Sequence, residues 1–207
     1  MRWTGGDEDD RGRAPSDAPI AFWTTFVLGS LAIPAAIALA HLLKVDLSRH
    51  LEITPRAALY GAGATLAPAL MLFWFMRSPW RPVAAFRESQ LEFLANLGFR
   101  LTPLRIAMLS AAAGVGEELL FRGVLQSAAD QHLPALAAIL LPNVLFAALH
   151  ARALLYALAA GAVGVYLGVL FWASGSLIAA MIAHALYDCI AFEWARRILK
   201  QRATSTD

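Results

Sequence analysis

The chain has 207 residues, of which 59% are hydrophobic and 15% charged, and its mean hydropathy is +0.58. This composition is too apolar for an ordinary soluble domain and suits one compact bundle of membrane helices. The formal net charge is +2 and the basic residues are spread along the sequence, so binding of nucleic acid has little support. A single cysteine, Cys189, excludes a framework of disulfides within the chain.

Residues 1–19 are rich in Gly, Asp and Arg and are expected to form a disordered tail. Apolar runs of about 17–25 residues, the length that crosses a bilayer, follow this tail. Six of them are predicted as transmembrane helices, at residues 20–43, 57–76, 104–129, 133–149, 153–173 and 176–194. The third contains charges, and the fourth is short and contains Pro142. We therefore expect an all-α, polytopic membrane bundle in one domain at 20–198, with a short tail at 199–207.

Residues 81–100 lie between the second and third predicted spans. Phe86, Leu91, Leu94 and Leu97 follow helical spacing there and alternate with charged and polar side chains. This pattern predicts a helix that lies along the bilayer surface. A plain amphipathic connector fits the same pattern, and the sequence does not separate the two.

The distribution of Lys and Arg predicts the orientation in the membrane, because cytoplasmic loops carry the excess of these residues. If all six segments cross, thirteen basic residues fall on the side of both termini and three, Lys44, Arg49 and Arg56, on the other. Both termini are therefore expected in the cytoplasm of what we take to be a bacterial cytoplasmic membrane. The small residues Ala160, Gly161, Gly164 and Gly168 in the fifth span predict close packing of helices.

Ionisable residues inside a span are costly and point to function by default. Glu117, Glu118 and Arg122 lie within the third predicted span. Glu118 and Arg122 are four residues apart and share a helix face, which predicts a buried ion pair. Glu117 is turned by about 100° from Glu118 and must face a different environment. The two carboxylates are therefore expected to have different roles.

Polar side chains recur on two further predicted helices. Asn143, Phe146 and His150 lie on one face of the fourth, and His184 and Asp188 on one face of the sixth. Inward-facing side chains of this kind converge in the core of a helical bundle. Each also has a structural interpretation: His150 as a hydrogen-bonded packing residue, Phe146 as a core aromatic, and Asp188 as a group that orients His184.

Glu117, His150 and His184 together have the chemistry to activate a water molecule. The same three side chains also have the composition of a two-histidine, one-glutamate site for a divalent metal such as zinc. The metalloprotease string H-E-x-x-H is absent, and a metal-free site is favoured. His150 falls at the end of a short span, so either that helix continues past Ala151 or the bundle is tilted.

The order and spacing of these motifs resemble a known family. The strings E-E-x-x-x-R at 117–122, F-x-x-x-H at 146–150 and H-x-x-x-D at 184–188 are similar to those of the CPBP intramembrane proteases, which include the CAAX prenyl proteases and the Abi-like proteins. The resemblance covers about residues 104–191, the expected protease core. It implies hydrolysis of a peptide bond inside the membrane by a glutamic-type endopeptidase.

The resemblance places Glu117 at the catalytic glutamate, and His150 and His184 at the two histidines. Glu118, Arg122, Asn143 and Phe146 are expected to support the site. Asp188 stands where many members have asparagine. An ionised aspartate cannot donate a hydrogen bond to an oxyanion, so Asp188 is either protonated or orients His184, or a histidine stabilises the oxyanion instead.

The implied partners are membrane lipid and a membrane-anchored protein or peptide substrate. The alternative function is a non-catalytic membrane binder, such as an immunity or scaffold protein that keeps the same fold. A proton-coupled transporter is a weaker alternative, because the sequence shows no inverted repeat.

Overall fold

The computed structural model describes residues 17–205, and the predicted N-terminal tail lies outside them except for Asp17 to Pro19. Helices form throughout the six predicted spans, and no strand is present in this described part of the chain. The element order is α1 (Pro19–Ser30), α2 (Ala32–Leu43), η1 (Leu47–His50), α3 (Pro55–Ala64), α4 (Leu66–Arg77), α5 (Arg81–Ala95), α6 (Pro103–Glu118), η2 (Leu119–Gln126), α7 (Ser127–Asp130), α8 (Ala135–Leu149), α9 (Leu154–Ser174) and α10 (Leu177–Thr204). The prediction of an all-α fold is confirmed.

Four helices of the described chain are long and apolar enough to cross a membrane, namely Pro19–Leu43, Pro55–Arg77, Leu154–Ser174 and Leu177–Thr204. The other two predicted spans are also helical. One is the continuous stretch α6–η2–α7, which carries the charges of the site, and the other is α8, whose 15 residues fall short of a usual span. Their crossing of the bilayer stays a prediction. Helix α10 continues through residues 199–204, which were predicted as a tail.

Prolines break the first two spans at similar places. A proline has no backbone N–H to donate to the carbonyl four residues earlier, so the helix is interrupted there. Pro34 follows the break at Leu31, and Pro68 follows the break at Thr65. The carbonyl of Ala64, which Pro68 leaves free, accepts a hydrogen bond of 2.8 Å from the Tyr166 hydroxyl on α9. The second break thereby joins α3 to the helix that lines one side of the site.

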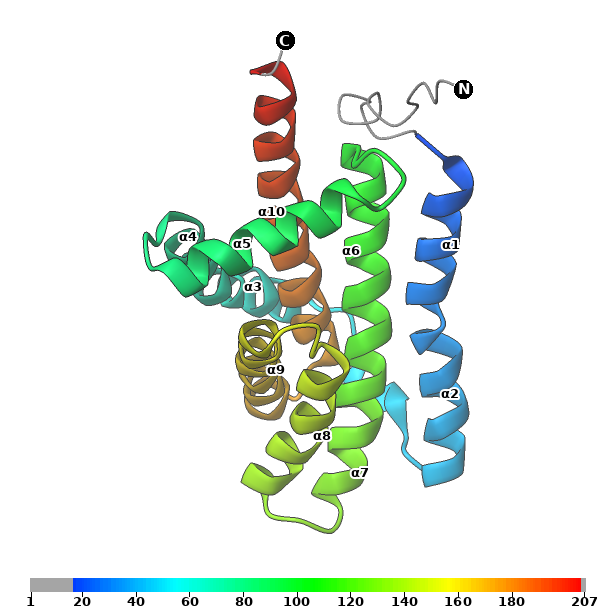
Figure 1. Ribbon diagram of the computed structural model, residues 1–207. Coiled ribbons are helices and arrows are strands. Elements are labelled where there is room, and N and C mark those ends of the chain that lie inside the picture. The colour runs from blue at the N-terminus through cyan, green and yellow to red at the C-terminus, as the bar shows by residue number, and fades with distance from the viewer. Residues whose placement is uncertain (1–16, 206–207) are drawn as a thin grey trace, which may run out of the picture.

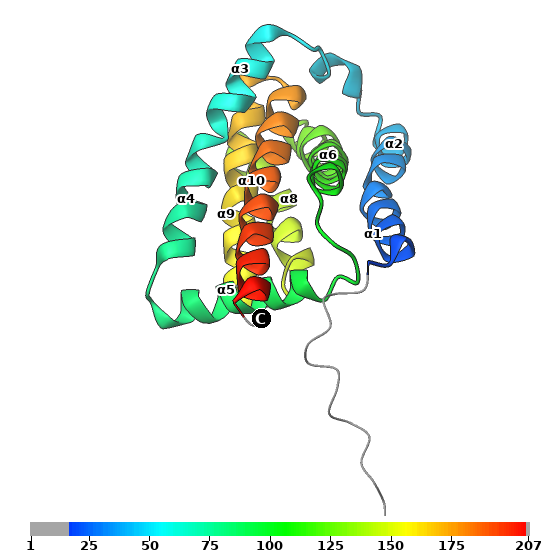
Figure 2. The same ribbon diagram turned by 90° about the horizontal axis from the view of Figure 1, so that it is seen from above.

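Helix α10 lies at the centre of the bundle, next to α3, α6 and α9 (Figures 1 and 2). Glycines allow two of these close contacts. A Cβ on Gly114 of α6 would lie 2.9 Å from Cβ of Ala185, and one on Gly61 of α3 would lie 2.7 Å from the carbonyl oxygen of Ala179. Because both approaches are too short for a side chain, these glycines fix how close α6 and α3 come to the helix that carries His184.

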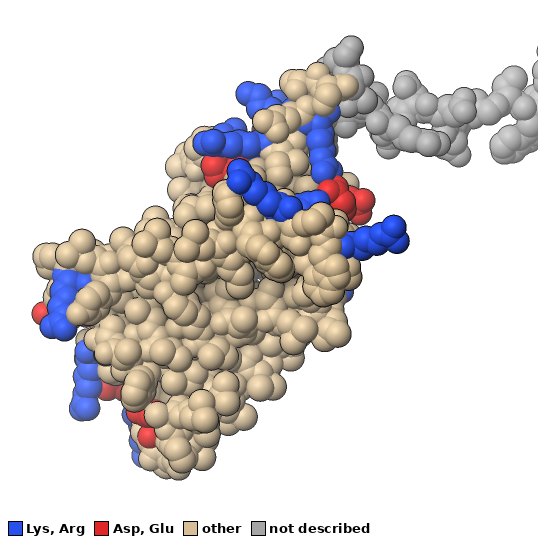
Figure 3. All heavy atoms as spheres, turned by 90° about the vertical axis from the view of Figure 1, so that its left-hand side faces the viewer, with Lys and Arg blue, Asp and Glu red and all other residues tan. Residues whose placement is uncertain are grey.

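The surface of the bundle is that of a protein in lipid. Large apolar side chains are exposed on several helices, including Leu59 at 73%, Leu136 at 69% and Leu154 at 77%. Figure 3 shows charged side chains gathered at two opposite ends of one face, with a broad uncharged belt between them. Soluble proteins do not leave apolar surface of this extent in water. The fold is therefore an integral membrane bundle.

Helix α5 runs across the ends of the other helices, between α4 and the loop before α6 (Figures 1 and 2). Arg202 of α10 donates to both carboxylate oxygens of Glu88, at 2.7 and 3.0 Å, and Arg152 donates to Gln90 at 2.6 Å. The hydrogen bonds from Arg202 lower the pKa of the Glu88 carboxyl, which keeps it ionised at neutral pH. This geometry agrees with the predicted surface helix.

Candidate active site

A buried guanidinium organises the site. Arg122, on the π-helical stretch η2, is fully buried, and its Nη1 donates to Oε1 of Glu118 at 2.9 Å. Its Nη2 donates to Oδ1 of Asn143 at 3.0 Å and to the carbonyl oxygen of Gly164 at 2.6 Å. The guanidinium carbon also lies 5.1 Å from the ring centre of Phe146. The predicted ion pair is therefore present, and it joins η2 to α8 and α9.

The small-residue stripe of α9 makes room for these polar groups. A Cβ on Gly164 would collide with Oδ1 of Asn143 and lie 3.1 Å from Nη2 of Arg122. One turn after Gly164 on α9, the carbonyl oxygen of Gly168 accepts a hydrogen bond of 2.9 Å from Nε2 of Gln126. The prediction of close packing is confirmed. The small-residue stripe also has a second role, which the sequence did not reveal. Its backbone carbonyls accept hydrogen bonds from side chains of η2.

This geometry predicts a large cost for adding one methyl group at Gly164. Gly164→Ala is expected to displace Asn143 and Arg122 and to lower thermal stability in detergent by at least 5 °C, because the collision involves buried hydrogen-bonded atoms. Gly63→Ala is the matched control, since nothing lies within 4 Å of the added Cβ. Equal melting temperatures for the two variants would contradict the packing described for α9.

The two adjacent glutamates occupy different environments, as the helical geometry predicts. Glu118 is fully buried between Arg122 and His184, whereas the side chain of Glu117 is 28% exposed. Glu117 faces a cavity of about 450 Å³ that is lined mainly by apolar side chains. One carboxylate is therefore fixed in a buried network, and the other is free to meet a substrate or water.

His184 links the buried network to the cavity. Its Nδ1 donates to Oε1 of Glu118 at 2.8 Å, because a carboxylate oxygen accepts this bond. Its Nε2 lies 3.9 Å from Oε2 of Glu117 and 3.6 Å from Oδ2 of Asp188. Glu118 thus orients the imidazole and turns Nε2 towards the other two carboxylates. Sequence reasoning paired Glu118 with Arg122 and missed this bridge to α10.

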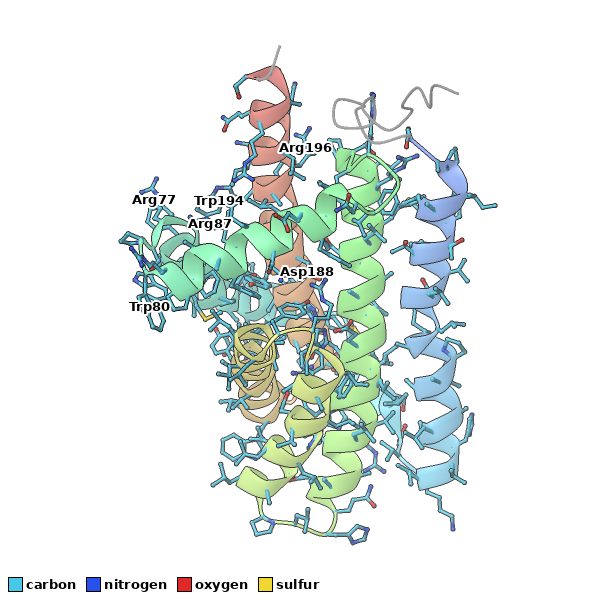
Figure 4. The ribbon with its side chains drawn as sticks, in the orientation of Figure 1. Arg77, Trp80, Arg87, Asp188, Trp194 and Arg196 are labelled. Carbon is cyan, nitrogen blue, oxygen red and sulfur yellow. The ribbon has the colours of Figure 1, made fainter. Side chains whose placement is uncertain are left out.

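Asp188 lies one turn after His184 on α10 and faces the same cavity. Figure 4 shows Asp188 among the side chains in the middle of the bundle, whereas Arg77, Trp80 and Arg196 lie towards the periphery. No hydrogen bond joins the side chains of Asp188 and His184 within the described structure, where Oδ2 of Asp188 lies 3.6 Å from Nε2 of His184. The orientation of His184 therefore comes from Glu118.

His150 is the residue that caps the C-terminal end of α8. Its Nδ1 donates to the carbonyl oxygen of Phe146 at 2.8 Å, and its ring centre lies 4.3 Å from that of Phe146. The helix ends at Leu149, so it does not continue past Ala151. Helices α6 and α9 instead cross steeply. In Figure 1 α9 is seen nearly end-on and α6 from the side, whereas in Figure 2 α6 is seen nearly end-on and α9 from the side. This inclination lets His150 line the same cavity as Glu117 and His184.

The cavity brings all four predicted catalytic residues together, but not as a metal cage. Among the described residues, no three His, Cys, Asp or Glu side chains are close enough to hold an ion. Zinc ligands lie about 2.0–2.2 Å from the metal, so the donor atoms of two ligands of one ion lie close together. The 3.9 Å between Nε2 of His184 and Oε2 of Glu117 is longer than such a site allows. The arrangement does not fit the metal site that Glu117, His150 and His184 could have formed.

Two tyrosines of the cavity escaped the sequence analysis. Tyr187 lies three residues after His184, a spacing that puts both on one helix face and could have identified it. Tyr156 of α9 lies between His150, with ring centres 5.6 Å apart, and Arg152, whose guanidinium is 4.8 Å from its ring. The contact of Tyr156 with His150 depends on how α8 and α9 pack, and no sequence pattern predicts it.

A protein-family model matches the part of the chain that contains this site. Residues 99–190 match the model of the type II CAAX prenyl endopeptidase Rce1-like family. This segment is therefore similar to the CPBP/CAAX proteases. The matched segment runs from just before α6 into α10 and contains the whole Glu118–Arg122–His184 network. No curated protein and no solved structure matched the chain. The family supports a CAAX-type membrane endopeptidase in general terms.

Proposed function

We propose that this chain is an intramembrane endopeptidase that hydrolyses a peptide bond in a membrane-anchored protein or peptide. The observation that carries the proposal is the meeting of Glu117 with Nε2 of His184 in a largely apolar cavity between lipid-exposed helices. The CPBP/CAAX family match supports the same reaction class. An apolar cavity of about 450 Å³ suits an extended peptide segment or an attached hydrocarbon chain.

In the proposed reaction, Glu117 accepts a proton from a water molecule as the water oxygen attacks the carbonyl carbon of the scissile bond. The negative charge that develops on the carbonyl oxygen is stabilised by the Nε2–H of His184 or His150 in its imidazolium form, because the Nδ1–H of each ring is already donated to Glu118 or to the carbonyl of Phe146. Glu117 then returns the proton to the leaving nitrogen as the carbon–nitrogen bond breaks. Glu118 and Arg122 act as positioning residues, because they hold the His184 ring without facing the cavity.

Asp188 gives a sharp test of where oxyanion stabilisation comes from. If His184 supplies it, Asp188→Asn is expected to keep cleavage within about tenfold of wild type, because asparagine preserves the shape and adds an N–H donor. The rate of peptide cleavage in detergent measures this effect. A loss as large as that expected for Glu117→Gln would show instead that the carboxylate of Asp188 is itself required.

We propose further that the protein resides in a bacterial cytoplasmic membrane with both termini in the cytoplasm. The contacts of Arg202 with Glu88 and of Arg152 with Gln90 support this orientation. They show that three basic segments assigned to one side of the membrane meet at one end of the bundle. Residues of α5 at this end also line the cavity, so the site would lie nearest the cytoplasmic leaflet.

The function is tested by incubating the purified full chain, reconstituted in lipid vesicles, with membrane-anchored peptides with and without a prenyl group. Mass spectrometry is expected to find one new C-terminus per cleaved peptide, and treatment with a chelator is expected to leave the rate unchanged. Loss of cleavage with recovery on adding Zn²⁺ would contradict the glutamate mechanism. Stable binding of peptides without any product would favour the non-catalytic binder.

A further inference from the structure

The active-site cavity extends to both sides of the reacting groups. Glu117 of α6 and His184 of α10 line it, and its walls also include residues of α4 and of α1. Figure 2 shows α10 and α6 between these two helices, with α4 on the left and α1 on the right. The cavity therefore has one arm towards α4 and another towards α1. Both outer helices lie outside the segment 99–190 that matches the family model.

The arm towards α1 is apolar. It is lined by residues of α1 and of the adjoining α6, namely Thr25, Phe26, Gly29, Leu109 and Ala113. None of these side chains is charged, and the Thr25 hydroxyl already donates to the carbonyl oxygen of Ala21 at 2.9 Å. Walls of this kind suit an apolar group and offer little to a charged one.

Gly29 leaves space in this arm close to the proposed base. A Cβ at Gly29 would have no heavy atom within 4 Å, so the volume beside its backbone is unfilled. A Cβ on Gly116, the residue before Glu117, would lie 3.7 Å from the carbonyl oxygen of Gly29. A substrate group beside Gly29 is therefore next to the turn of α6 that carries Glu117.

The packing of the helices does not require a glycine at this position. At Gly61 and Gly114 an added Cβ would lie 2.7 and 2.9 Å from atoms of α10, so those two glycines allow helices to approach each other. Gly29 has no such neighbour, and its position in the wall of the cavity is what distinguishes it. Its missing side chain enlarges the cavity instead.

We propose that Gly29 is a specificity-determining residue, and that the space beside it holds a large apolar group carried by a substrate residue that adjoins the scissile bond. The inference rests on the proposed function, because it describes a subsite of the same cavity. The group adjoins the scissile bond because Gly29 is next to the turn that carries Glu117. A bulky side chain and a hydrocarbon chain attached to a side chain present the same chemistry, and the experiment separates them.

The test is to fill the space with Gly29→Leu. Membrane-anchored peptides carry Ala, Phe or a prenylated Cys, first at the residue before the cleaved bond and then at the residue after it. At one of these positions, Gly29→Leu is expected to lower kcat/KM for the bulky peptides by about tenfold or more relative to the Ala peptide, because a hydrophobic pocket discriminates by size. A fall for Phe alone identifies a side chain as the occupant, and a fall for prenylated Cys alone identifies the hydrocarbon chain.

Gly63→Leu is the matched control. Gly63 is also a helical, exposed glycine with nothing within 4 Å of an added Cβ, but it does not line the cavity. Leucine has a higher helix propensity than glycine, so both variants are expected to fold. The ratio of kcat/KM between bulky and Ala peptides should stay at the wild-type value in Gly63→Leu. An equal change of this ratio in both variants would overturn the proposal.

Binding separates this inference from the proposed hydrolysis. The dissociation constants of the same peptides, fluorescently labelled, are measured for Glu117→Gln with and without Gly29→Leu. Selective weakening of the bulky peptides would support the subsite even if wild type cleaved none of them, and only the hydrolysis would then be lost. Binding that Gly29→Leu leaves unchanged for every peptide, or no binding of any peptide, would overturn the subsite.

Discussion

Glu117→Gln is expected to abolish cleavage while leaving the protein folded and inserted. Glutamine has the same shape but cannot accept the proton from water, and loss of a general base lowers rates by about 10²–10⁴-fold. The side chain of Glu117 is part-exposed to the cavity and makes no hydrogen bond in the described structure, so the fold does not depend on its charge. Cleavage of a membrane-anchored peptide in vesicles measures the rate.

The melting temperature of the same preparation serves as the control for this variant. It is expected to stay within about 2 °C of wild type, in contrast to variants of the buried network. Unchanged cleavage by Glu117→Gln would remove the proposed base, and loss of the folded protein would make Glu117 a structural residue.

Arg122→Ala is expected to destabilise the protein strongly. The change leaves Glu118 buried with a single partner, His184, and removes the donors to Asn143 and to the carbonyl of Gly164. Removing one member of a buried ion pair costs about 3–5 kcal/mol of folding free energy. The monodisperse fraction after extraction and the melting temperature report this loss.

Arg197→Ala is the matched control. Arg197 also pairs with a glutamate four residues away, Glu193, but its side chain is 72% exposed. An exposed pair contributes at most about 1 kcal/mol, so this variant should remain near wild type. A double change, Glu118→Leu with Arg122→Met, removes both charges and should recover part of the lost stability without activity. Similar stability of Arg122→Ala and Arg197→Ala would contradict the role of the buried pair.

The sequence predicted the parts of the structure that depend on local geometry. Runs of apolar residues located the helices, and the four-residue spacing of Glu118 and Arg122 predicted their ion pair, now seen at 2.9 Å. The turn of about 100° between neighbouring helix positions predicted that Glu117 and Glu118 would face different surroundings. The last two predictions need only the period of one helix.

Contacts between helices were predicted less well. The bond from His184 to Glu118 depends on how α6 and α10 are rotated about their axes, which a helical period does not determine. The acceptor role of the Gly164 carbonyl depends on a backbone atom, and backbone atoms carry no sequence signal. The length of α8 was uncertain for a related reason, because Pro142 lies inside the helix without ending it.

The most direct test of the site is an experimental map of the full chain in a lipid nanodisc that resolves side chains of α6 and α10. We expect the carboxylate of Glu117 and Nε2 of His184 to lie about 4 Å apart at one cavity, as in the 3.9 Å of the present structure. We also expect Nδ1 of His184 to donate a hydrogen bond to Glu118. A Glu117 side chain that faces lipid, far from both His184 and His150, would contradict the proposed reaction centre.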